Sequence, residues 1–275
     1  DLDSLVSEKK IKELEIKAKW VWEETLKIHY DAPETRVASS LSPIEILVGI
    51  YYGGFLNIFP KKPLHNDRDR LIISKGHGSL CMYPILADLG FFSKKELKNI
   101  CKEGSFLGGI PDPVIPGYET INGSLGHGVG VGSGMALALK REGRLKKVFV
   151  LTGDGELHEG SNWEAFMFAA QHKLDNLTIL VDDNKISMLG HTKNIVSHLS
   201  LPKKLKSFGW HVSVVDDGHN ISKVVRTLTK SNKMKKKPKA IIFNTNKGNQ
   251  VPGLENTTLA HVTAIKPEIK KNLIK

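Results

Sequence analysis

The sequence predicts an α/β protein with a doubly wound, mostly parallel sheet that is flanked by helices. Short apolar runs rich in β-branched residues alternate along the chain with segments of helical spacing, which is typical of this fold class. The length of 275 residues suits one large α/β domain with a substantial core. We therefore expect residues 1–275 to form a single domain.

Two helices and a short strand are predicted before the first glycine-rich turn. Residues 5–29 carry apolar side chains at helical spacing among lysines and glutamates, which predicts an amphipathic helix. A second helix is expected from Pro43 to about Phe55, with Ser42 as its cap, because serine caps helices and proline suits the first helical position. Residues 71–74 are predicted to form a buried strand.

The central stretch predicts strand, turn, helix and strand, which is one βαβ unit. Residues 148–152 are apolar and β-branched, as a buried parallel strand requires, and they end at the tripeptide Gly-Asp-Gly. A helix over 161–172 and a second apolar strand over 177–181 follow. The unit predicts two neighbouring parallel strands whose carboxyl ends lie on the same side of the sheet.

The remaining residues continue the same alternation. A short helix over 201–208 precedes a strand over 212–215, and a helix over 220–231 precedes a strand over 240–245. Asn220 is expected to cap the third of these elements, because asparagine is favoured at that position. The pattern extends the predicted parallel sheet.

Composition excludes several classes of protein. The net charge of +11 comes mainly from scattered lysines, and the cluster over 233–239 lacks interleaved aromatic residues that could stack on bases. We therefore expect no nucleic-acid partner.

No run approaches the roughly 18 apolar residues of a membrane span, and the first residues are charged where a signal peptide is apolar. Two cysteines, Cys81 and Cys101, lack metal-ligand spacing. We expect a cytoplasmic protein with no membrane partner.

Asp154 and Asn184 predict a Mg²⁺-diphosphate site. Each residue follows one of the two strands of the βαβ unit, so the two side chains can meet around one cation. A carboxylate, an amide oxygen and a backbone carbonyl just beyond Asn184 form a partial oxygen shell that diphosphate oxygens would complete. Ca²⁺ or Mn²⁺ would suit the same ligands. The amides after Asp154 would face the diphosphate. The alternative is a tight turn beside an ordinary loop asparagine.

The same motifs resemble those of thiamine diphosphate enzymes, and of the transketolase family among them. In that family Gly-Asp-Gly is followed at a similar spacing by asparagine, and here 28 residues separate the two. GDGELHEG, DDNKIS, SKGHG and NGSLGHG are each similar to transketolase segments, and the stretch after KGN resembles the segment that carries a family histidine, here His261. The resemblance covers about residues 10–262 and implies the thiamine diphosphate-binding fold.

The resemblance implies a role for each matching residue. Asp154, Asn184 and the Ile186 carbonyl would bind Mg²⁺, and the Gly155 amide would bind the diphosphate. Gly123 and Leu125 would line the thiazolium ring. His77 and His261 would contact the diphosphate and the substrate as catalytic groups. Two assignments stay open. Met188 would contact the thiazolium or belong to the core, and Glu159 would couple paired active sites or serve as a helix-start carboxylate.

The resemblance also implies a partner. In the family, a glutamate on a pyrimidine-binding domain activates the cofactor, and neither that domain nor the family's third domain is found in these 275 residues. We expect both on a separate transketolase-like chain, in an α2β2 heterotetramer with the cofactor at the interfaces. The chain would then be active only with this partner, and the pair would transfer a two-carbon ketol unit, or cleave a ketose, on a sugar or sugar phosphate.

Two departures from the family pattern affect the expected substrate site. Arg36 stands where family members usually carry a histidine, and Ile110 replaces a second histidine. An arginine suits bidentate recognition of a carboxylate or phosphate, and an isoleucine makes the pocket drier. We therefore expect an atypical or biosynthetic sugar substrate. The alternative is neutral drift in a housekeeping enzyme.

Other functions compete with this interpretation. A decarboxylating subunit of a 2-oxo acid dehydrogenase would share Gly-Asp-Gly and the division into two chains, but SKGHG and KGN favour transketolase. A non-catalytic scaffold or regulator would explain the lost histidines, but it has no need of the Asp154 and Asn184 pair. A Rossmann dinucleotide-binding protein is disfavoured, because no G-x-G-x-x-G follows the first strand.

Overall fold

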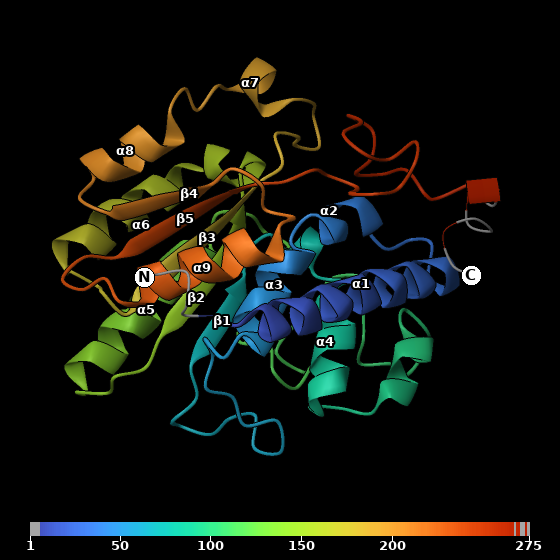
Figure 1. The fold of residues 1–275 in the computed structure, drawn as a ribbon, viewed down its shortest axis with the longest axis horizontal. Helices are drawn as coiled ribbons and strands as arrows, with labels where there is room; N and C mark the ends of the chain where they lie inside the picture. Colours follow the sequence, from blue (N-terminus) through green and yellow to red (C-terminus); the bar gives the residue numbers. More distant parts are fainter. Residues whose placement is uncertain (1–5, 267, 270–272, 274–275) are drawn as a thin grey trace.

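The computed structural model describes residues 6–266, 268, 269 and 273, and it contains a parallel sheet flanked by helices (Figure 1). Five strands are ordered β1-β2-β3-β5-β4, and every pairing among them is parallel. Their bounds are β1 (Arg70–Ile73), β2 (Val148–Gly153), β3 (Leu177–Asp183), β4 (His211–Val215) and β5 (Lys239–Asn244). The predicted fold class is therefore confirmed.

Helices cover both faces of the sheet because alternate strand residues point to opposite sides. Ile72, Val150, Ile179 and Ile242 pack with helices α5 (Gly128–Arg141), α6 (Gly160–Gln171) and α8 (Leu201–Ser207). Ile73, Leu151, Leu180 and Ile241 pack with α1 (Glu8–Asp31), α3 (Ile44–Tyr52) and α9 (Ile221–Asn232). The sheet thus has a hydrophobic core on each face, as a doubly wound fold requires.

The remaining helices are short. They are α2 (Val37–Leu41), α4 (Met82–Leu89) and α7 (Thr192–Ile195), with short 3₁₀ turns over Gly76–Gly78, Lys94–Asn99 and Gly155–His158. Two of these turns directly follow β1 and β2. They place the SKGHG and GDGELHEG motifs on one edge of the sheet.

The strand register brings four motifs together at the carboxyl edge. Ile73 of β1 pairs with Leu151 of β2, Gly153 pairs with Asp182 of β3, and the last residues of β3 pair with the last residues of β5. SKGHG, GDGELHEG, DDNKIS and the segment after β5 therefore leave neighbouring strands at the same level. Ligands of open parallel sheets bind at this edge.

Two predicted helix starts can be compared with the structure. The side chain of Asn220 accepts a hydrogen bond from the backbone of Lys223 and caps α9, as predicted. Helix α1 begins at Glu8, where the side chain of Ser7 caps it. The predicted start at residue 5 lies outside the described residues.

The predicted cap of the second helix is wrong. Ser42 makes no capping hydrogen bond, and its hydroxyl donates instead to the buried carboxylate of Asp182 at 2.6 Å. Helix α3 begins one residue after Pro43 and ends at Tyr52, before the predicted end at Phe55. A charge-assisted bond to a buried carboxylate is stronger than a cap, so the tertiary contact takes the hydroxyl.

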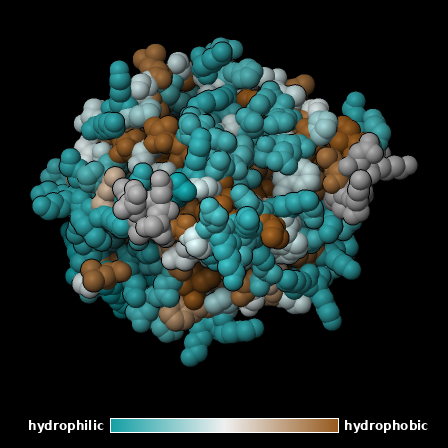
Figure 2. Space-filling model, in the orientation of Figure 1, coloured by the Kyte–Doolittle hydropathy of each residue, from teal (hydrophilic) through white to brown (hydrophobic). Residues whose placement is uncertain are grey.

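Figure 2 shows a mostly hydrophilic face with hydrophobic residues scattered among the charged ones. Isolated exposed apolar residues are normal on a folded protein. Among the described residues, no helix has the length and the apolar character that crossing a membrane requires.

Candidate functional site

A cleft of about 330 Å³ opens at the carboxyl edge of the sheet. Most of the residues predicted for the site line it: His77, Leu125, Asp154, Gly155, Glu159, Asn184, Ile186, Met188 and His261. They come from the segments that follow β1, β2, β3 and β5 and from the loop before α5. Gly123 and Arg36 lie outside the lining and are described below.

Asp154 is the acidic centre of the cleft. Its side chain is buried, and one carboxylate oxygen accepts a hydrogen bond from the Thr192 hydroxyl at 2.9 Å. Burial raises the pKa of Asp154 to about 6, with the charges of Asp183 and Asp182 acting in the same direction. A buried carboxylate beside other acids gains from a bound cation, because the cation offsets both the desolvation and the repulsion.

Asn184 and Ile186 present further oxygen atoms. The Asn184 side-chain oxygen accepts from the Ile186 amide at 3.1 Å, and its amide nitrogen donates to the Ser42 hydroxyl at 3.3 Å, so the side chain is held in one orientation. A carboxylate, an amide oxygen and a backbone carbonyl fit a hard divalent cation such as Mg²⁺. No group of three His, Cys, Asp or Glu residues within the described part of the chain could hold a metal. Remaining ligands would have to come from a diphosphate or water.

Two buried lysines that the sequence analysis did not single out bring positive charge to the cleft. Lys75 forms a buried ion pair with Asp182. Lys247 follows β5, is 2% exposed and donates to the Ile186 carbonyl at 3.1 Å. Among the described residues no carboxylate pairs with Lys247, and burial together with the charge of Lys75 lowers its pKa to about 8. A cation without a paired carboxylate suits an anionic ligand such as a diphosphate. The sequence signal that could have identified them is that Lys75 belongs to the SKGHG motif and Lys247 to the KGN motif.

The buried carboxylate of Glu156 makes hydrogen bonds that connect three of the motifs. The sequence analysis did not single out this residue either. One of its carboxylate oxygens accepts from the Ser74 hydroxyl and from the Gly126 amide, the latter at 3.0 Å. The other accepts from the Gly153 amide at 3.3 Å. A Cβ on Gly126 would lie 2.6 Å from the Cβ of Glu159, so only glycine allows this approach. A local sequence pattern does not predict such a contact between residues that are distant in the chain.

His77 and His261 form a pair at the mouth of the cleft. Their ring centroids are 5.3 Å apart, and Nδ1 of His261 lies 3.0 Å from the Ser39 hydroxyl. Burial lowers the pKa of both rings, and the charges of Arg36, Lys247 and Lys75 lower it further, to about 4 for His261. Both rings are therefore neutral at pH 7, a state in which an imidazole can accept or donate a proton.

Arg36 lies near this pair of histidines, because its charge acts on both rings. Within the described residues the Arg36 guanidinium makes no ion pair and no hydrogen bond. The Ile110 side chain lies 3.6 Å from where a Cβ on Gly123 would be, and the Gly123 amide nitrogen lies 2.8 Å from the corresponding point on Gly76. The two departures from the family pattern thus both lie close to His77.

The structure excludes one of the two roles considered for Met188. Met188 is 65% exposed and lies at the rim of the cleft, so it does not belong to the core. Glu159 occupies the N-cap position of α6 without making a side-chain capping bond. Its position is compatible with both roles considered for it.

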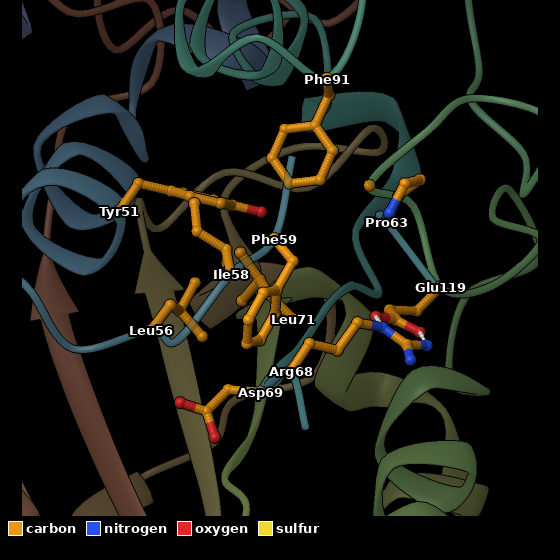
Figure 3. Close-up of a pocket in the computed structure, with 11 residues that line it drawn as sticks. Tyr51, Leu56, Ile58, Phe59, Pro63, Arg68, Asp69, Leu71, Phe91 and Glu119 are labelled. Atoms are coloured by element: carbon orange, nitrogen blue, oxygen red, sulfur yellow. Dashed lines mark hydrogen bonds and ion pairs between the residues drawn. The ribbon is translucent and has the colours of Figure 1, made fainter. Parts of the chain in front are cut away.

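A second cavity lies near the amino end of β1, away from the cleft (Figure 3). The Arg68 guanidinium binds both carboxylate oxygens of Glu119 at 2.9 and 2.8 Å on one side, and the Tyr51 side chain extends toward the same space from α3. The cavity measures about 20 Å³. That volume holds about one water molecule, so it is no cofactor site.

The fold and the cleft together define an α/β protein with a polar cleft at the carboxyl edge of its parallel sheet, lined by residues whose chemistry suits a cation and a diphosphate. The family model described as the transketolase, thiamine diphosphate binding domain matches residues 39–274. The chain therefore belongs to the transketolase family of thiamine diphosphate-dependent transferases and carries its cofactor-binding domain. The resemblance noted in the motifs is confirmed.

Two relatives of similar length are named as transketolase subunits. One is an apulose-4-phosphate transketolase subunit from Actinobacillus succinogenes, to which the chain is 41% identical over 245 residues, and the match covers 88% of each chain. Another is the 6-deoxy-6-sulfo-D-fructose transketolase subunit SqwG of a Clostridium species, which is 35% identical over 86% of this chain and 85% of that one.

The transketolase of Campylobacter jejuni has the same fold, with a TM-score of 0.88 at 29% identity. The match covers 94% of this chain but 42% of the Campylobacter chain, so this chain spans about two fifths of that protein.

Proposed function

We propose that this chain is the diphosphate-binding subunit of a two-subunit transketolase-like enzyme that uses thiamine diphosphate and Mg²⁺ to transfer a two-carbon ketol unit. The observation that carries the proposal is the cleft itself. It combines a buried carboxylate and two further oxygen donors with two buried lysines, of which Lys247 has no carboxylate partner among the described residues. A metal-diphosphate group supplies the charges that this arrangement lacks.

Each residue then has a task. Asp154, Asn184 and the Ile186 carbonyl hold the metal, while Lys75 and Lys247 offset the charge of the diphosphate. Bound thiamine diphosphate would supply the nucleophilic carbon that attacks a ketose carbonyl. The neutral rings of His77 and His261 hold or move protons at the substrate oxygens, and the apolar side chains of Leu125 and Met188 keep water from the thiazolium.

A separate chain completes the active site in this proposal. Relatives of this length are named as subunits, and apolar residues at the rim of the cleft are exposed, with Met188 at 65% and Leu189 at 78%. The partner brings the pyrimidine-binding glutamate and covers this rim. Two copies of each chain would form an α2β2 heterotetramer in the cytoplasm.

The substrate in this proposal is an atypical sugar. Two relatives are named for apulose 4-phosphate and for 6-deoxy-6-sulfo-D-fructose. Arg36 adds a cation beside His77, and Ile110 replaces a polar group with an apolar one, so the pocket favours an anionic or less hydroxylated group. Turnover of xylulose 5-phosphate by the assembled enzyme should be slow. Ordinary transketolase rates with that donor would contradict the substrate assignment.

The cofactor assignment is tested by titration calorimetry with thiamine diphosphate and Mg²⁺, using the chain alone and then together with the chain encoded beside it. We expect binding to appear, or to tighten at least tenfold, with the partner. Asp154→Ala should abolish it, because the variant removes the only charged metal ligand proposed.

Asp216→Ala is the matched control, since this exposed aspartate also follows a parallel strand but lies outside the cleft. Absence of cofactor binding in both wild-type preparations would reject the catalytic function and favour the scaffold alternative.

A further inference from the structure

Residues 245–249 follow β5 and contact the cleft on one side and the helical layer on the other. Lys247 extends into the cleft, where its ammonium group contacts the Ile186 carbonyl. The backbone of the same segment binds α2 through the Gly248 amide and the Ala38 carbonyl, at 3.0 Å. The position of the Lys247 ammonium therefore depends on what holds this short segment from behind.

His219 binds the segment next to Lys247. The Asn246 amide donates to Nε2 of His219 at 2.8 Å, and Nδ1 of the same ring lies 3.0 Å from a carboxylate oxygen of Glu45 and 3.0 Å from the side-chain nitrogen of Asn249. A backbone amide only donates, so Nε2 must be an unprotonated acceptor. The hydrogen of the neutral ring is then on Nδ1, where it is donated to Glu45. Glu45 thus selects the tautomer that can accept from Asn246.

Both members of the pair stand on well-packed elements. Glu45 lies in the first turn of α3, and His219 directly precedes the cap of α9. The two helices pack closely, since a Cβ on Gly49 would lie 3.1 Å from the Val224 side chain. Both side chains are largely buried, at 13% exposure for Glu45 and 15% for His219. A side chain held by packed helices can fix a neighbouring backbone accurately.

The pair lies outside the cofactor cleft. Glu45 and His219 line a separate surface groove of about 650 Å³ together with Trp22 and Gln250, and neither lines the cleft. Trp22 adds a second bond from this side, because its indole donates to the Asn249 carbonyl at 3.0 Å. Neither Glu45 nor His219 can touch a ligand in the cleft, so any effect on that ligand must pass through the segment.

We propose that Glu45 and His219 are positioning residues that hold residues 245–249 and so place the Lys247 ammonium for the cofactor diphosphate. This inference rests on the proposed function, because it assigns Lys247 to that diphosphate. Removing the His219 acceptor leaves the Asn246 amide unpaired, and the segment then relaxes away from the cleft. Cofactor affinity should fall while the remaining metal ligands stay in place.

The test compares three variants in the assembled complex. His219→Phe keeps the ring volume but removes the acceptor, His219→Gln offers a side-chain oxygen in its place, and His211→Phe is the matched control. The His211 ring also binds the backbone, here the Lys235 carbonyl, but His211 is the first residue of β4, whereas His219 follows the end of that strand. We expect His219→Phe to weaken thiamine diphosphate binding about tenfold in calorimetry, since a lost hydrogen bond that aligns a charged group typically costs about that factor.

Hydrogen exchange supplies a measurement that needs no cofactor. The Asn246 amide should exchange faster in His219→Phe than in the wild type, whereas His219→Gln should restore most of the protection and His211→Phe should leave it unchanged. If His219→Phe does not fold, Glu45→Leu replaces it, because this change frees the ring to take the other tautomer. Equal effects of the Phe and Gln variants would overturn the proposal.

A double-mutant cycle separates positioning from general stability. If His219 acts through Lys247, adding His219→Phe to Lys247→Met should weaken cofactor binding no further. Additive losses, or a His219→Phe variant that binds as tightly as the wild type, would overturn this inference and leave the proposed function standing. A wild-type complex that does not bind the cofactor would overturn both.

Discussion

His29 lies in the last turn of α1 with its ring almost wholly buried. Its Nδ1 is 3.0 Å from the Thr35 hydroxyl, which itself donates to the Ala32 carbonyl at 2.7 Å. The hydroxyl oxygen therefore accepts from the ring, so Nδ1 carries the hydrogen. Burial lowers the pKa of His29 to about 4 from its ordinary value of 6.5. The folded protein thus holds a neutral histidine that the unfolded chain would protonate in mild acid.

This difference predicts a pH dependence of stability. Between pH 6.5 and 4 the unfolded chain binds a proton at His29 that the folded protein does not, so stability falls as the pH falls through this window. The loss from this residue should reach about 2 kcal/mol at pH 5. Urea unfolding at pH 7 and pH 5 measures it, with His29→Asn as the control that keeps a donor to Thr35. Equal losses in the two proteins would contradict the prediction.

At the scale of elements, left-handed turns decide where segments can meet. Gly248 in the segment after β5 and Gly143 after α5 share the same backbone angle, with φ of +70°. They differ in their surroundings, because a Cβ on Gly248 would lie 2.8 Å from the Leu254 carbonyl oxygen, whereas one on Gly143 meets nothing within 4 Å. A comparison of substitutions at these two glycines therefore separates the intrinsic strain of a left-handed residue from the steric clash at Gly248.

Alanine substitutions at these two glycines should therefore differ. Gly143→Ala is expected to cost about 1 kcal/mol, which is the strain of a left-handed alanine. Gly248→Ala should cost at least about 1 kcal/mol more, because the backbone must also move to relieve the clash. Thermal or urea unfolding of both variants measures the difference. Equal costs would mean that the segment adapts freely.

At the scale of the whole molecule, apolar side chains are exposed both at the cleft and far from it. Leu189 at the rim of the cleft is 78% exposed, and Leu145 in the connection between α5 and β2 is 97% exposed. Leu145 lies just before the amino end of β2, on the opposite edge of the sheet from the cleft. Only the rim residue would be covered by a partner that completes the active site.

Charged substitutions at the two leucines test this assignment. Leu189→Asp should weaken association with the partner chain by at least about tenfold, because a buried interface residue would become an unpaired charge. Leu145→Asp should leave association unchanged, and neither variant should lose stability as an isolated chain, since both side chains are exposed. Analytical ultracentrifugation of the mixed chains gives the affinities. A loss of affinity that is the same for both variants would place the partner elsewhere.

The sequence by itself determined the sheet, the order of its strands along the chain and half of the residues that line the cleft. Apolar β-branched runs, an aspartate between two glycines and an asparagine cap are local signals, because near neighbours in the chain dictate them. Asp154 and Asn184 could be identified in this way, since each closely follows a strand, whereas His77 was identified through the resemblance of SKGHG to a transketolase motif. The parallel register then brings them to one edge.

Only the tertiary structure decided which polar groups meet across the fold. Ser42 has the local pattern of a cap but binds Asp182, 140 residues away, and Glu156 reaches Gly126 across 30 residues. Lys247 and His219 likewise acquire their partners from segments distant in the chain. The physical reason is that such contacts depend on the path of the whole chain, and a buried charge takes the strongest partner that this path provides.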